Sequence, residues 1–175
     1  MIEIRRIADS NDFEAQQLIG LHGETFPQYE RFHGTSLLAE LIDNARAMHF
    51  NAVYEDGVLA GFFNYWDLGN AYYIHFIAVY PAMRNRKVGQ QILDWIVANL
   101  HQPVFLESEV PFDEITARRL DFYKRNGFKE LAEDPEILSS NRKGGHPQCL
   151  MGTRPVADLD AYLKAIRDVV YYAGE

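Results

Sequence analysis

The sequence contains almost no cysteine, since Cys149 is the only one in 175 residues. A single cysteine cannot form a disulfide within the chain, and it excludes the metal sites that are built on cysteine pairs. The six histidines show no spacing that would close a metal site either. The sequence therefore predicts a protein without a disulfide or a metal ion, and a cytoplasmic location fits it best.

Long hydrophobic runs are missing as well. No segment approaches the roughly 20 apolar residues of a membrane-spanning helix, and the arginines near the N-terminus have no apolar run behind them. Basic residues are too few to balance the acidic ones, 17 against 25, so the net charge is −8. This charge opposes general binding to nucleic acid or to an anionic membrane, whereas an amine or another cationic substrate is easily accommodated.

Hydrophobic residues make up 47% of the chain and aromatic residues 13%, which is enough for one core. We therefore expect a single domain over residues 1–175. Alternating apolar and polar residues predict a strand over 2–7, and the patterns that follow predict helices over about 12–26 and 36–45.

Three strand-like runs follow between residues 50 and 81, separated by Asp56-Gly57 and by the segment DLGN, both of which are signals for hairpin turns. The remaining elements are expected in this order: a helix over 88–100, a strand over 104–110, a helix that Asp113 caps and Gly127 ends, a strand near 148–154 and a C-terminal helix from Leu159. An antiparallel meander followed by a strand–helix–strand crossover predicts an α/β fold around one mixed central sheet flanked by helices.

The segment YPAMRNRKVGQQIL, residues 80–93, places Arg84, Arg86 and Lys87 directly before a predicted helix. The backbone N–H groups at the start of a helix and the positive end of its dipole bind phosphate, and nearby cations would strengthen that binding. On charge alone, an ordinary solvated basic turn is an equally good interpretation.

The context of this loop carries a resemblance. A strand that ends in IAVYP, an Arg-x-x-x-x-Gly loop and an amphipathic helix resemble motif A of the GCN5-related N-acetyltransferase (GNAT) superfamily, in which the loop binds the pyrophosphate of acetyl-CoA. The segment LESEV followed by RRLDFYKRNGF resembles motif B, in which a helix carries a tyrosine four residues before Gly-Phe. The two motifs cover residues 50–130, in the order and spacing of that superfamily.

The resemblance implies acetyl-CoA as co-substrate and assigns its contacts. The backbones of Ile77, Ala78 and Val79 would bind the pantetheine arm, and Thr116 takes the place of a motif B asparagine that contacts the same arm. The residues expected to hold the pyrophosphate are Arg84, Asn85, Arg86, Lys87, Val88, Gly89 and Gln90.

One residue of the loop departs from the superfamily pattern, because Lys87 stands where a glycine is usual. We expect a negative φ and an outward side chain at this position, since that arrangement keeps the phosphate path open. Whether Lys87 contacts a phosphate of CoA or lies in solvent is left open by the sequence.

Acetyl transfer requires a neutral amine, stabilisation of the oxyanion and a proton for the departing thiolate. By resemblance, Tyr123 takes the position of the general acid; the alternative is a core aromatic residue. Alternation along the strand puts Glu107 and Glu109 on one face. Glu107, in the sequence LES, matches the base of superfamily members that acetylate protein N-termini, and Glu109 would attract the protonated amine. Solvated glutamates at a strand edge are the alternative.

Two further features bear on the acceptor. The loop FPQYERFHG lies in the region that covers the acceptor side in this superfamily, so Glu30 and Arg31 are candidate substrate contacts. His75 is assigned no catalytic role, because a lone histidine in a core strand is more often hydrogen-bonded than catalytic.

The sequence therefore predicts an acetyl-CoA-dependent N-acetyltransferase that acts directly on a primary amine, either a small molecule or a peptide. A CoA-binding sensor or partner module without turnover is the alternative that the Lys87 departure raises. A nucleotide-binding phosphate loop is disfavoured, because the chain lacks the Gly-Lys-Ser/Thr ending of that motif. A monomer and a homodimer both remain open.

Overall fold

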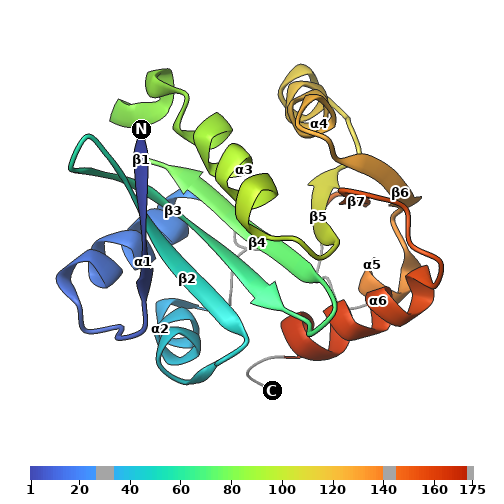
Figure 1. The fold of residues 1–175 in the computed structure, drawn as a ribbon, viewed down its shortest axis with the longest axis horizontal. Coiled ribbons are helices and arrows are strands. Elements are labelled where there is room, and N and C mark those ends of the chain that lie inside the picture. Colours follow the sequence, from blue (N-terminus) through green and yellow to red (C-terminus); the bar gives the residue numbers. More distant parts are fainter. Residues whose placement is uncertain (27–33, 140–144, 173–175) are drawn as a thin grey trace.

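A seven-stranded mixed sheet organises the protein (Figure 1), whose computed structural model describes residues 1–26, 34–139 and 145–172. The strands lie side by side in the order β1-β2-β3-β4-β5-β7-β6, and only β4 and β5 run parallel to each other. Their bounds are β1 Ile2–Ile7, β2 Met48–Glu55, β3 Val58–Asp67, β4 Tyr72–Val79, β5 Val104–Glu109, β6 Lys129–Glu133 and β7 Gln148–Gly152. The predicted α/β fold around one mixed sheet is confirmed.

Helices cover both faces of this sheet. One face packs against α1, α2, α5 and α6 and includes Phe62 and Phe105, whereas the other packs against α3 and α4 and includes Phe63 and Leu106. The helices are α1 Phe13–Thr25, α2 Gly34–Asn44, α3 Val88–Asn99, α4 Glu114–Arg125, α5 Glu136–Ser139 and α6 Leu159–Ile166, with a 3₁₀ helix η1 Pro81–Arg86 and a π-helical segment η2 Arg167–Tyr171. The short α5, η1 and η2 were not predicted.

Local sequence signals account for the turns. Asp56 and Gly57 both have positive φ, 50° and 79°, which is the conformation of the tight hairpin turn that Asp-Gly favours. Gly69 closes the next hairpin with a φ of 90°. Asp113 caps α4 by accepting a hydrogen bond from the Thr116 N–H at 2.8 Å, and Gly127 follows that helix with a φ of 89°. These four signals were interpreted correctly.

The central pair of strands separates after a short contact. β4 and β5 pair only from Tyr72 to Ile74 on one strand and from Val104 to Leu106 on the other, although both strands continue further. In Figure 1 they run apart, with α3 beside β4 and α4 beside β5. The backbone edge of β4 beyond Ile74 is therefore paired with no strand on its β5 side in the described part of the chain.

On its other side, β4 lies unusually close to β3 at Gly61. A Cβ built on Gly61 would lie 2.1 Å from the carbonyl oxygen of Ala78 and 2.9 Å from the Cα of Val79. Both atoms belong to the backbone, so only a shift of β4 away from β3 could accommodate a side chain. Gly61 thus fixes how closely the two strands approach along the free part of β4.

This contact yields a stability prediction. Gly61→Ala should lower the free energy of unfolding by about 1–3 kcal/mol, because the new methyl group overpacks the β3–β4 contact. Gly20→Ala is the matched control: Gly20 lies in α1 with no atom within 4 Å of a built Cβ. That change should stabilise the protein by about 0.5–1 kcal/mol through helix propensity. Denaturant titrations measure both, and equal effects would contradict the close approach at Gly61.

Candidate functional site

The point at which β4 and β5 separate collects polar side chains on one face of the sheet. Glu107 is the first residue of β5 beyond the last pair with β4. It shares a face with Phe105, which packs in the core beneath α6. Tyr73 Oη donates a hydrogen bond of 2.9 Å to Glu107 Oε1, and Tyr171 Oη donates to the same oxygen. Two phenols therefore hold the carboxylate of Glu107 at the point where β4 and β5 separate, which we call the vertex.

Tyr73 remains protonated in this environment. Burial, together with the negative charge of Glu107, raises the pKa of Tyr73 well above its ordinary value. A protonated phenol can only act as a donor toward a carboxylate, so the contact orients Glu107 without neutralising its charge. Tyr73 and Tyr171 were missed in the sequence, because they are 34 and 64 residues from Glu107 and no local pattern connects them.

His75 occupies the matching position on β4. Asn64 of β3 pairs with Phe76 and Tyr65 with Ile74, so His75 is the extra residue of a β-bulge. The side chain of Asn64 satisfies the bulge by accepting a bond of 2.9 Å from the Phe76 N–H. The bulge directs the strand beside the vertex, as bulges commonly do near functional sites.

The protonation state of His75 follows from its contacts. The indole of Trp66, which can only donate, reaches Nδ1 of His75 at 3.3 Å, so Nδ1 accepts and the proton lies on Nε2. Burial, with a smaller effect of His22, lowers the pKa of His75 to about 3. His75 is thus neutral throughout the physiological range, which makes it a hydrogen-bonding group and no proton acceptor near neutral pH.

Tyr123 lies on the opposite face of the sheet. It belongs to α4 and packs against the core beneath α3 and α4, with ring contacts to Phe122 at 5.6 Å and Phe128 at 6.1 Å between centroids. Burial raises the pKa of the Tyr123 phenol, and the charge of Arg119 offsets part of that effect. The hydroxyl is therefore protonated at neutral pH and is able to donate.

The basic loop takes a conformation that differs from the prediction at one residue. Lys87, between η1 and α3, has a φ of 56° and a ψ of 29°, so the expectation of a negative φ is wrong. Its exposed side chain points outward as expected. The left-handed conformation explains why the superfamily prefers glycine here, because glycine adopts it without steric cost. Lys87 reproduces the backbone that glycine would give.

The start of α3 is open to an anion. No side chain caps this helix, so the backbone N–H groups of its first turn lack intrahelical partners. A Cβ built on Gly89 would have Phe122 of α4 as its nearest neighbour, at 3.9 Å. A methyl group at position 89 would therefore make an ordinary van der Waals contact, so packing alone does not require glycine here.

The cations of the loop have weak partners. Arg84 Nε donates to the Val79 carbonyl at 3.4 Å, and Arg86 lies 3.8 Å from Asp56 as an exposed ion pair. Exposed pairs of this kind contribute little to stability. Asn85 is exposed and Val88, the first residue of α3, is buried, whereas Gln90 donates to Asp94 at 2.9 Å and also to Asn126. Positive charge at the helix start is therefore only partly compensated.

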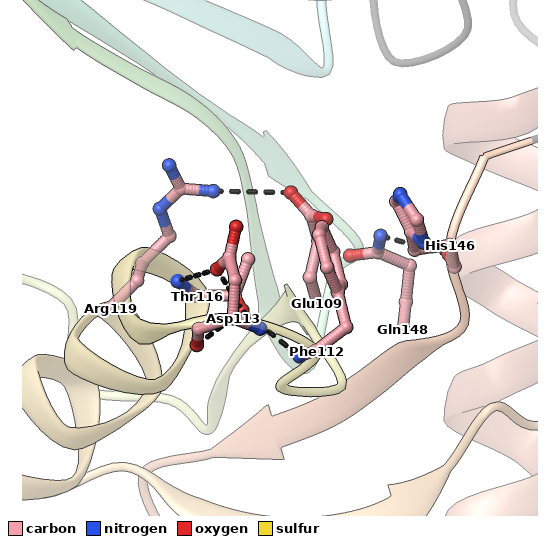
Figure 2. Close-up of polar contacts among 7 residues, drawn as sticks. All are labelled: Glu109, Phe112, Asp113, Thr116, Arg119, His146 and Gln148. Carbon is pink, nitrogen blue, oxygen red and sulfur yellow. Dashed lines mark hydrogen bonds and ion pairs between the residues drawn. The ribbon is translucent and has the colours of Figure 1, made fainter.

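The predicted pantetheine contacts are differently placed. Ile77, Ala78 and Val79 lie on the free part of β4. Thr116, by contrast, is buried in the capping box of α4, where its hydroxyl donates to Asp113 and accepts from the Phe112 and Asp113 N–H groups (Figure 2). These bonds give Thr116 a structural role, and its contact with pantetheine stays a prediction.

Glu109 differs from Glu107 in its partner. Figure 2 shows the Arg119 guanidinium directed at Glu109, with 3.2 Å between Nη1 and Oε1. The side chain of Glu109 is only 10% exposed, and its Oε2 has no hydrogen-bond partner among the described residues. Arg119 thus compensates the charge of Glu109, whereas Glu107 is held by neutral donors. The remaining candidates, Glu30 and Arg31, lie outside the described residues.

Other chemistries find little support in the described part of the chain. Burial, followed by the charge of Glu130, raises the pKa of Cys149 to about 12, so this buried thiol is unsuited to act as a nucleophile. Within residues 1–26, 34–139 and 145–172, no group of three or more His, Cys, Asp or Glu side chains is placed to hold a metal ion. No helix in these ranges combines the length and apolar character needed to cross a membrane.

Comparison with solved structures identifies the fold. A protein from Bacteroides thetaiotaomicron assigned to the GNAT acetyltransferases is similar with a TM-score of 0.84 and 28% identity, over 97% of this chain and 98% of that one. An aminoglycoside 6′-N-acetyltransferase complexed with coenzyme A gives a TM-score of 0.64 at 16% identity, over 89% and 99%. The ribosomal-protein-S18-alanine N-acetyltransferase from Escherichia coli gives 0.60 at 14%, over 90% and 98%. At the two lower identities the likeness shows the fold alone.

The sequence itself gives the family. A search of curated proteins found no match. The model of the acetyltransferase (GNAT) domain, however, matches residues 34–130, which is more than half of the chain and includes the basic loop and Tyr123. The resemblance seen in the two sequence motifs is therefore confirmed: this protein belongs to the GNAT family of acetyltransferases, acyltransferases whose co-substrate is acetyl-CoA.

Proposed function

We propose that the protein transfers the acetyl group of acetyl-CoA directly to a primary amine, with Glu107 as general base and Tyr123 as general acid. The observation that carries this proposal is the separation of β4 and β5 with these two groups on opposite faces of the sheet. A thioester that passes between the strands would meet Tyr123 on the α4 side, and an amine would approach Glu107 from the α6 side.

The features of the chain fit acetyl-CoA. The uncapped start of α3 and the cations around it suit a pyrophosphate. The unpaired backbone edge from Ile77 to Val79 suits an extended amide-containing arm, and an N–H group there would polarise the thioester carbonyl. Acetyl-CoA supplies the activated acetyl group; the chain's own residues bind it, orient it and move two protons.

The two protons need groups in different states. The amine reaches the site largely protonated, and Glu107, whose Oε1 accepts hydrogen bonds from two phenols, takes up that proton. The departing sulfur requires a donor, and burial keeps the Tyr123 phenol protonated at neutral pH. The buried Cys149 supports transfer without an acyl-enzyme.

Three observations favour an amine as the acceptor. The net charge of −8 attracts cations. The similar structures include enzymes named as N-acetyltransferases of an aminoglycoside, of spermidine and of the alanine of ribosomal protein S18. The base candidate at the point where β4 and β5 separate is a carboxylate, which suits a cationic acceptor. Together these favour a small or peptidic primary amine.

The glycine-like conformation of Lys87 removes the main reason for considering a CoA-binding module without turnover. Whether the protein turns over acetyl-CoA is tested by measuring thioester cleavage without an amine and with a panel of amino acids, polyamines, aminoglycosides and peptide N-termini. Amine-dependent release of CoA is expected. Tight CoA binding with no amine-dependent release would contradict the proposed activity.

The cofactor loop gives the first activity-related prediction. Gly89→Glu should weaken CoA binding about 100-fold or more, because a carboxylate would lie against the pyrophosphate. Gly89→Ala should change affinity less than about threefold, since the nearest atom to its Cβ is 3.9 Å away. Lys87→Gly should also have little effect, because glycine tolerates the same φ. Calorimetry measures all three, and comparable losses from Gly89→Glu and Lys87→Gly would refute this geometry.

The acid is tested by Tyr123→Phe, which removes one hydroxyl and preserves the ring contacts. If the phenol protonates the leaving thiolate, kcat should fall about 100-fold while the KM for acetyl-CoA stays nearly constant. Tyr162→Phe is a suitable control, since Tyr162 is a partly buried tyrosine of α6 that packs on Phe105. A kcat for Tyr123→Phe within about threefold of the wild type would make Tyr123 structural.

The base is tested by Glu107→Gln, which keeps the shape and removes the charge. The value of kcat/KM should fall, and its rise with pH should move toward the pKa of the free amine, because only amine that is already neutral can react. Glu109→Gln is the comparison: it would leave Arg119 unpaired, so KM for a cationic amine should rise, more strongly at low salt, with kcat preserved. A wild-type pH profile in Glu107→Gln would exclude Glu107 as the base.

A further inference from the structure

The C-terminal segment contributes a side chain to the candidate site. Tyr171 ends the π-helical segment η2, and its hydroxyl donates to Glu107 Oε1 across 64 positions of sequence. The segment lies outside residues 34–130, the range that the family model matches. The contact with Glu107 is therefore a feature of this chain's own C-terminal region.

The backbone of this region explains how Tyr171 reaches the sheet. Ile166 and Val170 are buried at 0% and 2% exposure, which anchors the helix on the core beneath β5. In an α-helix, a residue five positions after Ile166 would be rotated by about 140° away from it. A π-helical turn has more residues per turn, so residues five apart come close to one line. The Tyr172 N–H bonds to the Arg167 carbonyl at 3.1 Å, five residues back, as that geometry requires.

The effect on Glu107 is one of orientation. A carboxylate on a glutamate rotates freely unless its oxygens are held, and the terminal torsion has broad minima. Tyr73 approaches Oε1 from β4 and Tyr171 approaches the same oxygen from η2, so donors on two elements fix the plane of the group. Both donors are phenols, so they orient the carboxylate without forming an ion pair with it.

We infer that Tyr171 is a positioning residue for proton transfer from the acceptor amine, acting through Glu107. This inference rests on the proposed role of Glu107 as the base. The ammonium proton passes to Glu107, and the neutral amine forms the new C–N bond as the C–S bond breaks. Tyr123 protonates the departing thiolate, and the second proton that the nitrogen loses restores the Tyr123 phenol through solvent. Tyr171 keeps its own proton throughout. Without the Tyr171 hydroxyl, Glu107 would lose one of the donors that orient it and would spend less time in the productive orientation.

The test is a double-mutant cycle on the intact protein, with the best amine from the acceptor panel as the probe. Tyr171→Phe should lower kcat about tenfold at neutral pH and leave the KM for acetyl-CoA unchanged. In the Glu107→Gln background the same substitution should cost nothing further, because the group it positions is gone. Tyr172→Phe, in the adjacent and exposed position, is the matched control and should be silent in both backgrounds.

Measuring kcat as a function of pH makes the double-mutant cycle informative even if Glu107→Gln has very low activity at neutral pH. At a pH near the pKa of the amine, much of the amine is already neutral and does not need a base. The activity of Glu107→Gln should then become measurable, and the loss of kcat caused by Tyr171→Phe should be smaller. A purely structural role for Tyr171 would instead give the same loss at every pH and in both backgrounds, and that result would overturn the inference. A silent Tyr171→Phe beside an impaired Glu107→Gln would also overturn it. A silent Glu107→Gln would instead remove the base assignment itself.

Discussion

The separation of β4 and β5 after three residue pairs is the constraint on which the rest of the site depends. In the described part of the chain it leaves the β5-side edge of β4 beyond Ile74 without a strand partner, at a point of the sheet that has α3 and α4 on one face and α6 on the other. Two features of the neighbouring backbone determine the course of β4 beside this separation. Gly61 holds the free part of β4 tightly against β3, and the bulge at His75, satisfied by Asn64, redirects the strand where the pairing with β5 ends.

Positive charge is concentrated in the loop before α3, whereas the rest of the chain is acidic. Arg84, Arg86 and Lys87 account for +3 of the net charge of −8, so the remainder of the chain carries −11. The two carboxylates on one face of β5 then differ in their partners. Arg119 compensates Glu109, whereas Glu107 accepts hydrogen bonds from phenols that carry no charge. Glu107 thus combines a fixed orientation with a position at the point where β4 and β5 separate.

Sequence reasoning reached those parts of the protein that depend on neighbouring residues. The Asp56-Gly57 turn, the Asp113 cap and the motif around Tyr123 are each encoded within a few positions, and they were correctly located. The φ of Lys87 was predicted wrongly, because a lysine gives no sign that the loop needs a left-handed residue. Tyr73 and Tyr171 were missed because their contacts with Glu107 depend on how distant elements pack, and residue spacing carries no information about such packing.

Two of the intrinsically unfavourable backbone conformations in the described part of the chain adjoin the candidate site. A left-handed lysine costs about 1–2 kcal/mol relative to a right-handed one, and a π-helical turn has poorer geometry than an α-helical one. The left-handed conformation occurs at Lys87, where the loop leads into α3. The π-helical turn occurs in η2, where it directs Tyr171 toward Glu107. The first occurs at a position where the family uses glycine; the second occurs beyond the range that the family model matches. The cofactor side of the site thus follows the family backbone with an unusual residue, whereas the acceptor side is completed by an element outside the range that the family model matches.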